Sequence, residues 1–590
     1  MFNTRVRAIA SDVNAGVRSA ERVARETLER ISAYDAIQPE AWISQVPAER
    51  VLESAKRVDE RIAAGESLLL AGVAVAVKDN IDVAGLDTTA ACPAFSYRPT
   101  ASAHVVEHLV AAGAIVVGKT NLDQFATGLV GTRSPYGSPG CVYNREYVSG
   151  GSSSGSAVLV AAGVVPLALG SDTAGSGRVP AAFNNLVGWK PTRGRWSSRG
   201  LVPACRTLDC ITTLTSDAED AALVDSVVTD FDRTDPYARR TPLQPPVIGS
   251  HFRFGIPRSG QLADLPPQDA ALFAAAVLRM QSVGGTAVEV DVSPLLEAAG
   301  LLYGGPWVAE RTAALEALLE SQPTAIHPVV RAIVQAGKGI SAVQAFRGLY
   351  ALQNYMRTAE ELWEGIDVLV LPTTPTIYRR GEVLAEPVAL NAHLGRYTNF
   401  VNLLDMSAIS LPAGFRDNGT GVGVSLVCPA WADVGLLELA ARYERAGACP
   451  VAPELDRTAR PPGLVQLAVV GAHLSGMPLN WQLSSRGARL VRRTRTAPVY
   501  RLYAMTGQNP PKPALVHSGE GGGAIELEVY ELEVSAFGSF VTEVPAPLAI
   551  GAVILEDGAS VRGFVAEPRA LTGALDITAA GGWRAYLSRR

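Results

Sequence analysis

The chain has 590 residues, of which 48% are hydrophobic and 18% are charged, a composition that excludes a disordered protein and allows a large buried core. Its length predicts more than one domain. The formal net charge of -5 and the lack of any long run of Lys and Arg argue against a surface for nucleic acid or for an acidic membrane, so we expect neither partner.

The cysteines give no sign of a disulfide framework or of a metal site. Six are present, no two form a Cys-x-x-Cys pair, and no cluster of Cys and His has the spacing of zinc ligands. We therefore expect reduced, mostly buried thiols, a cytoplasmic location and no metal. The first residues lead into a charged helical pattern instead of an apolar signal segment, and no apolar stretch is long enough to span a bilayer.

Two amphipathic helices are predicted near the start, at residues 16–34 and 47–64, where charged residues separate spaced Val, Leu and Ile. They could pack over a core or form the seam of a homodimer. Packing over a core is the favoured interpretation of these helices, and a homodimer is also expected.

From residue 71 the pattern alternates between short apolar runs and helical periodicity, which predicts an α/β fold with helices over a largely buried sheet. The predicted strands are Val73–Val77, Ala114–Val117, Val164–Leu169, Phe252–Ile256, Thr286–Val292, Val368–Leu371 and Gly421–Cys428. The predicted helices are Ala103–Ala112, Ala157–Ala162, Asp269–Ser282 and Leu436–Glu444.

A proline-rich stretch at residues 449–463 has no apolar period and is the predicted linker. It would separate a domain at residues 1–448, whose first 65 residues are helical, from a smaller unit at 464–590. The smaller unit is predicted to be β-rich, with strands at Val465–Val470, Tyr500–Tyr503, Ile525–Leu532 and Ala549–Leu555.

A loop made only of Ser and Gly, residues 149–156, stands directly before a predicted helix. Such a loop can bind phosphate through backbone N–H groups at the helix N-terminus, but the Gly-Lys-Ser/Thr ending of a P-loop is absent. A flexible linker is the other interpretation, and its position inside a core pattern argues against it.

A second small-residue segment, residues 170–181, places Ser176 where a substrate carbonyl would have room. Its successive backbone N–H groups could form an oxyanion hole, and the candidate donors are Thr173, Ala174, Gly175 and Ser176.

A serine nucleophile needs a base, and none of the seven histidines lies in this segment. Lys78 ends an apolar strand, and burial would lower its pKa enough for it to act as that base. Without the other segments, the favoured interpretation of Lys78 is an exposed surface lysine, since lysines are seldom fully buried.

The sequence resembles the amidase signature family in three segments that follow one another in this order: the strand that ends at Lys78, the Ser/Gly loop 149–156, and residues 170–181. The resemblance implies an α/β/α sandwich around a large mixed sheet, no cofactor, and a Ser–cisSer–Lys triad of Ser176, Ser152 and Lys78. The family often has Gly at the position of Ala174 and Ile at that of Gly177, but Ala retains the backbone N–H.

Residues 128–137 and 303–311 resemble allophanate hydrolases within this family. That resemblance implies that Gly128, Tyr303 and Arg311 bind a small anionic amide through its carboxylate. Their spacing would place Tyr303 and Arg311 on nearly one face of a helix, although a core Tyr and a surface Arg would give the same pattern.

Residues 469–483 resemble the C-terminal domain of allophanate hydrolases, an α+β unit with a γ-glutamyl cyclotransferase-like fold. The resemblance implies a decarboxylation of N-carboxycarbamate that involves His473, which could equally be a structural histidine. Tyr503 and Glu526 are weaker candidates for the same pocket.

Together the resemblances imply hydrolysis of allophanate (urea-1-carboxylate) to ammonia and carbon dioxide in nitrogen metabolism, during breakdown of urea, biuret or cyanuric acid. The alternatives are an amidohydrolase of the same family acting on a different small amide, the A subunit of a glutamyl-tRNA amidotransferase, and a non-catalytic scaffold. An amidotransferase subunit would need a tRNA surface, which the acidic charge does not favour, and a scaffold would have no use for all three triad residues.

Overall fold

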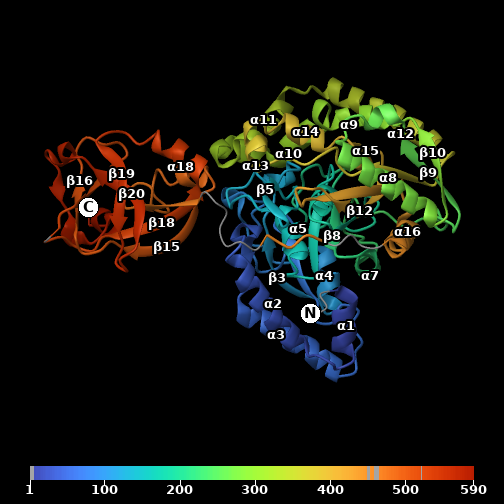
Figure 1. The fold of residues 1–590 in the computed structure, drawn as a ribbon, viewed down its shortest axis with the longest axis horizontal. Helices are drawn as coiled ribbons and strands as arrows, with labels where there is room; N and C mark the ends of the chain where they lie inside the picture. Colours follow the sequence, from blue (N-terminus) through green and yellow to red (C-terminus); the bar gives the residue numbers. More distant parts are fainter. Residues whose placement is uncertain (1–4, 448–451, 457–463, 520, 590) are drawn as a thin grey trace. The chain divides into compact units, whose positions relative to one another are not determined.

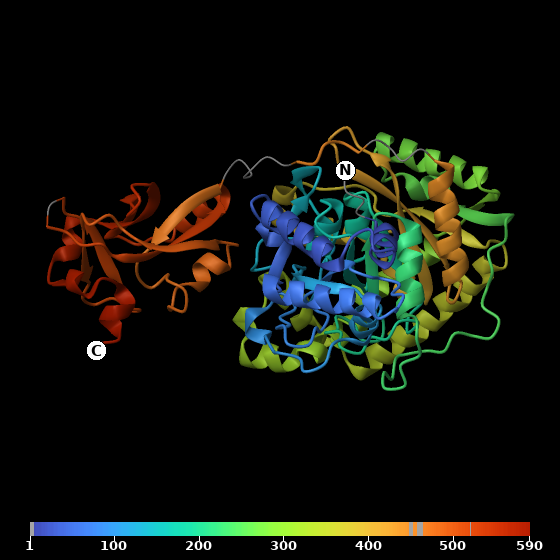
Figure 2. The ribbon, with the colours of Figure 1, turned by 90° about the horizontal axis from the view of Figure 1, so that it is seen from below.

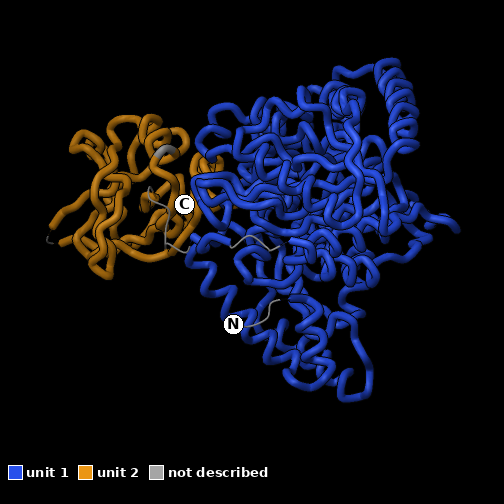
Figure 3. The backbone as a smooth tube through the Cα atoms, turned by 45° about the vertical axis from the view of Figure 1, so that its right-hand side comes forward, with its two compact units in different colours: residues 1–134, 138–457 blue, residues 135–137, 458–590 orange. Residues whose placement is uncertain are grey.

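The computed structural model describes residues 5–447, 452–456, 464–519 and 521–589, which form two compact units (Figure 3). The first contains residues 1–134 and 138–457, and the second contains residues 135–137 and 458–590. The division falls inside the predicted linker 449–463, most of which lies outside the described residues.

In the described part of the first unit, the strands form an 11-stranded mixed sheet, which confirms the predicted α/β class (Figure 1). The strand order is β1-β3-β2-β6-β8-β7-β12-β13-β11-β9-β10. The bounds of these strands are β1 Trp42–Gln45, β2 Ala74–Lys78, β3 Ile115–Thr120, β6 Leu167–Asp172, β7 Val187–Lys190, β8 Cys210–Thr215, β9 Phe252–Pro257, β10 Gly285–Val290, β11 Val368–Pro372, β12 Met406–Phe415 and β13 Gly421–Pro429. A separate pair contains β4 Gly140–Cys141 and β5 Asn144–Val148.

Helices surround this sheet, and each helix predicted from the sequence is present within a few residues of its expected bounds. They are α1 Val6–Asn14, α2 Ala20–Asp35, α3 Ala48–Ala63, α4 His104–Ala111, α5 Ser154–Ala161, α6 Arg178–Phe183, α7 Ala218–Val228, α8 Pro267–Ser282, α9 Ser293–Gly304, α10 Trp307–Ser321, α11 Pro328–Ala336, α12 Ala342–Trp363, α13 Arg380–Ala385, α14 Ala389–Leu394, α15 Asn399–Leu403 and α16 Asp433–Ala446. Figure 1 shows the blue helices α1 to α3 at one end of the unit and the green helices α9 to α12 at the other.

The N-terminal helices pack over the core, as the favoured interpretation of the sequence predicts. Helices α2 and α3 run side by side (Figure 2), and their apolar faces join the main core cluster through Val23, Ile31, Val51 and Val58. The side-chain oxygen of Ser19 accepts a hydrogen bond from the N–H of Arg22 and so caps the start of α2.

The parallel strands β2 and β6 are neighbours inside the sheet, with Val77 opposite Leu169. Every residue of both strands is buried, which explains why residues 74–77 and 167–169 read as apolar runs without alternation. Because parallel strands end at the same edge of a sheet, Lys78 and Asp172 lie at one edge, although they are distant in sequence.

The second unit is β-rich, as predicted, with a five-stranded sheet in the order β15-β18-β14-β20-β19 and a three-stranded sheet in the order β17-β16-β21. Its elements are β14 Leu464–Val469, α17 Trp481–Ser484, β15 Arg489–Arg495, β16 Tyr500–Ala504, β17 Pro513–His517, β18 Glu526–Glu533, α18 Val534–Val541, β19 Leu548–Ile554, β20 Ser560–Ala566, β21 Leu575–Asp576 and α19 Trp583–Leu587. A separate apolar core fills it, with Leu467, Val529 and Phe540 among its members.

Among the described residues, five cysteines are buried and unpaired, which confirms the expectation of free thiols there. None of the helices in the described ranges has the length and apolar character needed to cross a bilayer.

Candidate functional site

Lys78 ends strand β2 and is completely buried, so the surface interpretation of this lysine is wrong. Its Nζ donates hydrogen bonds to the hydroxyls of Ser152, at 2.7 Å, and of Ser171, at 2.8 Å. Burial lowers the pKa of Lys78 to about 7, although nearby carboxylates act in the opposite direction. None of the carboxylates in the described residues lies within ion-pair distance of it. A lysine in this setting can be neutral near physiological pH.

Ser152 lies in the Ser/Gly loop before α5, and the peptide bond between Gly151 and Ser152 is cis. The loop is buried, which is incompatible with a flexible linker. The carbonyl of Ser152 accepts hydrogen bonds from the N–H groups of Asp123 and Ser154. A side chain at Gly151 would clash with Asp123, so glycine is required for the close packing of this loop.

Ser176 lies in the loop after β6 and is 2% exposed. Its carbonyl accepts a hydrogen bond from the N–H of Ser153, and its hydroxyl donates to the carbonyl of Gly128 at 3.4 Å. The structure therefore brings Lys78, Ser152 and Ser176 together, with Gly128 beside the last of them.

Asp172, which the sequence analysis did not single out, fixes the shape of the loop that carries Ser176. It accepts hydrogen bonds from the N–H groups of Gly175 and Gly177 and forms a buried ion pair with Arg178, 3.0 Å away. Burial opposes the charge, but Arg178 and these hydrogen bonds hold the pKa of Asp172 below its usual value. Its position at a strand end before a glycine-rich loop was the available signal.

The bond to Asp172 occupies the N–H of Gly175, one of the four candidate oxyanion donors. The N–H groups of Thr173, Ala174 and Ser176 make no hydrogen bond to another described group. These three donors are free to bind an oxygen atom of a ligand.

We expect Asp172→Asn to lower the free energy of unfolding of the first unit by about 3–5 kcal/mol, because it leaves the Arg178 guanidinium buried without its counter-charge. Urea denaturation followed by fluorescence measures this change. The matched control is Glu360→Gln, which breaks an exposed ion pair with Arg357 and should cost less than about 1 kcal/mol. Equal effects of the two substitutions would contradict the prediction.

Asp209 is a second buried carboxylate that sequence reasoning missed, and no sequence motif marked it. It accepts hydrogen bonds from the Thr173 hydroxyl, at 2.5 Å, and from the N–H groups of Ala204 and Cys205. Burial raises the pKa of Asp209 to about 6, against these hydrogen bonds and the charge of Arg311. The carboxylate ties the start of the Ser176 loop to the segment before β8.

Tyr303 and Arg311 lie on two helices instead of one, so the helical spacing argument is wrong. Tyr303 belongs to α9 and Arg311 to α10. The helical conformation is interrupted at Gly305, which is extended before Pro306. The break follows from the proline, which disfavours a helical conformation in the residue before it. The pair nevertheless meets, because the Arg311 guanidinium carbon lies 5.3 Å from the centre of the Tyr303 ring.

Arg311 is 2% exposed, which excludes a surface arginine. Its Nη1 donates to the hydroxyl of Thr127 at 3.1 Å, and its Nε has no hydrogen-bond partner in the described part of the chain. No carboxylate in that part lies within ion-pair distance of Arg311. Since Thr127 precedes Gly128, whose carbonyl contacts Ser176, a buried cation with no carboxylate within ion-pair distance in the described residues lies close to the serine cluster of Ser152 and Ser176.

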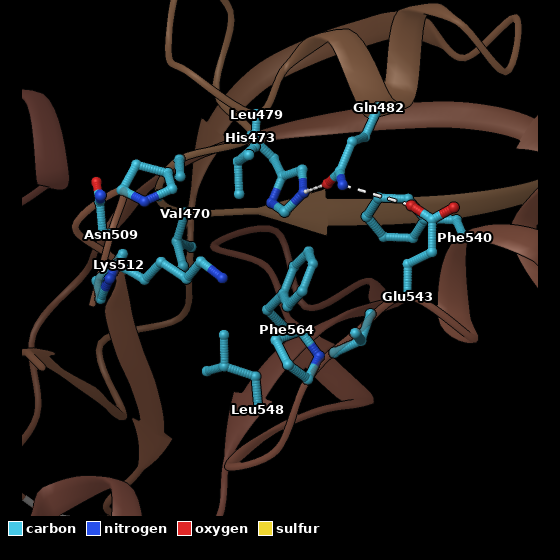
Figure 4. Close-up of a pocket in the computed structure, with 16 residues that line it drawn as sticks. Val470, His473, Leu479, Gln482, Asn509, Lys512, Phe540, Glu543, Leu548 and Phe564 are labelled. Carbon is cyan, nitrogen blue, oxygen red and sulfur yellow. Dashed lines mark hydrogen bonds between the residues drawn. The ribbon is translucent and has the colours of Figure 1, made fainter. Parts of the chain in front are cut away.

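His473 lines a cavity of about 240 Å³ in the second unit (Figure 4). Its ring stacks on Phe564, with centroids 5.0 Å apart, and its Nε2 lies 2.8 Å from the Gln482 amide oxygen. Burial lowers the pKa of His473. Lys512 and Glu543 also line the cavity, and Figure 4 shows Lys512 extending toward the space beside His473.

Tyr503 and Glu526 are absent from the lining of this cavity, so the weaker candidates for it are wrong. Tyr503 is paired within the three-stranded sheet, and Glu526 forms an ion pair with Arg584.

Comparison with protein families gives one match in each of the two units. A family model described as Amidase matches residues 22–437, and one described as Allophanate hydrolase C-terminal domain matches residues 465–588.

Individual relatives agree with the two family matches. The urea amidolyase of Saccharomyces cerevisiae is 43% identical over 580 residues, which is 92% of this chain but 31% of that protein. The A subunit of glutamyl-tRNA(Gln) amidotransferase from Symbiobacterium thermophilum is 36% identical, and the match covers 73% of this chain and 94% of that one. The solved structure of Kluyveromyces lactis allophanate hydrolase matches with a TM-score of 0.69 and 40% identity, over 97% of each chain.

The chain thus spans about a third of the length of the yeast urea amidolyases and nearly all of the Kluyveromyces allophanate hydrolase. The resemblance stated from the sequence is confirmed: the chain belongs to the amidase family and carries an allophanate hydrolase C-terminal domain.

Proposed function

We propose that this protein hydrolyses allophanate, with Ser176 as nucleophile. The observation that carries the proposal is the buried Arg311 guanidinium, which lacks a carboxylate partner in the described residues and lies close to the serine cluster. A small amide bearing a carboxylate would supply that counter-charge, because a guanidinium can bind both oxygens of a carboxylate. The proposed substrate site also includes Gly128 and Tyr303, whose ring lies under the Arg311 guanidinium.

In this mechanism neutral Lys78 takes a proton from Ser152, which takes one from Ser176. The Ser176 oxygen attacks the terminal amide carbonyl, and N–H groups of the segment from Thr173 to Ser176 stabilise the oxyanion. The C–N bond then breaks, and the leaving nitrogen receives the relayed proton and departs as ammonia. Water attacks the resulting ester and releases N-carboxycarbamate. No cofactor is required for any of these steps.

The ammonia-release assay that tests this function compares allophanate with malonamate, biuret, urea and an aryl amide. We expect release from allophanate and malonamate, which both carry a carboxylate, and little from the three neutral compounds. Release confined to the aryl amide would favour the alternative, an amidohydrolase of the same family with another substrate. Release from none of them would favour a scaffold.

We expect the kcat/KM of the enzyme for malonamate to rise with pH through about 7 and then to level off. The pKa of Lys78 is lowered to about 7, and the base must be neutral, so the active fraction grows as the pH increases through that value. Rates measured from about pH 6 to about pH 9 test this, since the malonamate carboxylate stays ionised throughout. A rate that falls over this range would contradict the role of Lys78.

We further propose that the cavity around His473 accelerates the decarboxylation of N-carboxycarbamate. The C–N bond to one carboxylate breaks, carbon dioxide leaves, and the electron pair on nitrogen takes a proton to give carbamate. Lys512 supports this proposal, because it brings a positive charge to a cavity that would receive a dianion, and in the described part it has no ion-pair partner. His473 is the group that can donate the proton.

His473→Ala separates the two reactions. We expect it to leave the release of the first ammonia within a few-fold of wild type while slowing the appearance of carbon dioxide, measured in the same reaction by a coupled assay. The matched control is His517→Ala, on β17, which does not line the cavity. Carbon dioxide release that keeps pace with the first ammonia in His473→Ala would show that the histidine is structural.

A homodimer and a cytoplasmic location are also part of the proposal. Free, buried cysteines suit a reducing compartment. Size-exclusion chromatography with light scattering would report the mass of two chains for a dimer and of one chain for a monomer.

A further inference from the structure

A cluster of two imidazoles and one carboxylate lies in the first unit, outside the residues assigned to catalysis. His104 and His108 are one turn apart on α4, and their Nε2 atoms are 3.2 Å apart. The Asp230 Oδ2 atom lies 4.0 Å from the Nε2 of His108. Asp230 follows helix α7, which packs against α4. The three potential ligand atoms all lie within 4.8 Å of one another.

We propose that His104, His108 and Asp230 bind a divalent transition metal ion, with Zn²⁺ as the reference ion, and that this ion links α4 to the segment after α7. Two imidazoles and a carboxylate are the ligands that zinc uses in three-residue sites, where water takes the fourth position. Copper and nickel also favour imidazole.

The separation of the two histidine nitrogens suits a shared ion. Nitrogens bound at about 2.0–2.1 Å to a tetrahedral zinc are about 3.3 Å apart, close to the 3.2 Å observed. Residues four apart on a helix face the same way, so both rings present Nε2 to the same point. The Asp230 side chain is 63% exposed, which leaves it free to approach the ion.

The charges around the cluster also favour a cation. Arg199 is the nearby cation, and its guanidinium is already paired with Glu107, at 2.7 Å, and with Asp232, at 2.9 Å. Asp230 lies beside His108 and is not paired with Arg199 among the ion pairs of the described residues.

The sequence analysis predicted no metal because the three ligand residues lie in two segments that are far apart in the chain. Two histidines one turn apart on an amphipathic helix are common, and Asp230 is far along the chain. A hydrogen bond between the two rings, without any ion, would produce the same spacing of the nitrogens, and binding measurements separate the two possibilities.

The test is calorimetric titration with Zn²⁺ of the tag-free 590-residue chain, which is first treated with a chelator. We expect one ion per chain in addition to any weak surface binding. His108→Ala, at a partly exposed position, should lower the affinity at this site by at least roughly 10-fold to 100-fold, the loss typical of disrupting even the support of a metal ligand. Asp230→Asn should weaken the site while retaining the histidine pair.

His251→Ala is the matched control, because His251 is an exposed histidine outside the cluster, and it should bind as the wild type does. A second readout is thermal unfolding: Zn²⁺ should raise the Tm of the wild type and of His251→Ala but not that of His108→Ala. If His108→Ala and His104→Ala both bind Zn²⁺ as tightly as the wild type, or if the wild type binds no ion at this stoichiometry, the proposal is wrong.

Discussion

Ser176→Ala should lower kcat for allophanate by roughly 10⁴-fold or more, the size of loss found when a serine hydrolase loses its nucleophile. The Ser176 hydroxyl lies against the carbonyl of Gly128, next to Thr127, which Arg311 contacts, whereas the Ser152 hydroxyl accepts a hydrogen bond from Lys78. Binding should persist, because the carboxylate contact does not involve this hydroxyl. Ammonia release at saturating substrate measures the loss in kcat, and titration of the variant with malonamate measures binding.

Ser154→Ala is the matched control in the neighbouring Ser/Gly loop. Its hydroxyl donates to the carbonyl of Asn121, which also accepts the N–H of Gly155, so the loop keeps its backbone anchor. We expect kcat to stay within a few-fold of wild type. If Ser176→Ala retained activity comparable to that of Ser154→Ala, the nucleophile would have to be a different residue.

Arg311→Met should reduce kcat/KM for malonamate by about 10²- to 10³-fold, because a buried, charge-paired contact contributes about 3–4 kcal/mol to binding. Malonamide, which has the same skeleton but no charge, should lose far less. Methionine fills a similar apolar volume and leaves no buried charge, so the fold should tolerate it. The measurement is the ratio of the two kcat/KM values in wild type and variant.

Arg311→Lys keeps the charge but cannot bind both carboxylate oxygens with a planar fork, and we expect it to fall between wild type and Arg311→Met. Arg331→Met, on α11, is a matched control whose guanidinium donates to the carbonyl of Pro323. Equal losses on malonamate and malonamide in Arg311→Met would mean that Arg311 supports the fold and does not recognise the carboxylate.

Much of the fold could be predicted because β2 and the first half of β6 are apolar runs and α2 and α3 are strongly amphipathic. Strand β8 could not, because its buried interior contains threonines whose hydroxyls hide the pattern. The antiparallel strands around it depend on pairing between distant segments, which local periodicity does not encode.

The residues of the candidate site also differ in how far the sequence could predict them. Lys78, Ser152 and Ser176 belong to local motifs, and the sequence alone indicated them. Asp172 and Asp209 act through hydrogen bonds to loops; Asp172 was signalled only by its place at a strand end before a glycine-rich loop, and Asp209 had no sequence signal. Tyr303 and Arg311 do meet, as expected, but the assumption of one continuous helix missed the break at Gly305.

That break has a consequence for how new activities could arise. The proposed reacting groups lie on the sheet of the first unit and its loops, whereas the side chains proposed to recognise the carboxylate lie on two helices joined at Gly305 and Pro306. Substitutions on these helices can therefore exchange the preferred substrate while the bond-breaking chemistry is inherited unchanged. A directed-evolution library confined to residues 300–312 is the economical starting point for converting this enzyme to neutral or cationic amides.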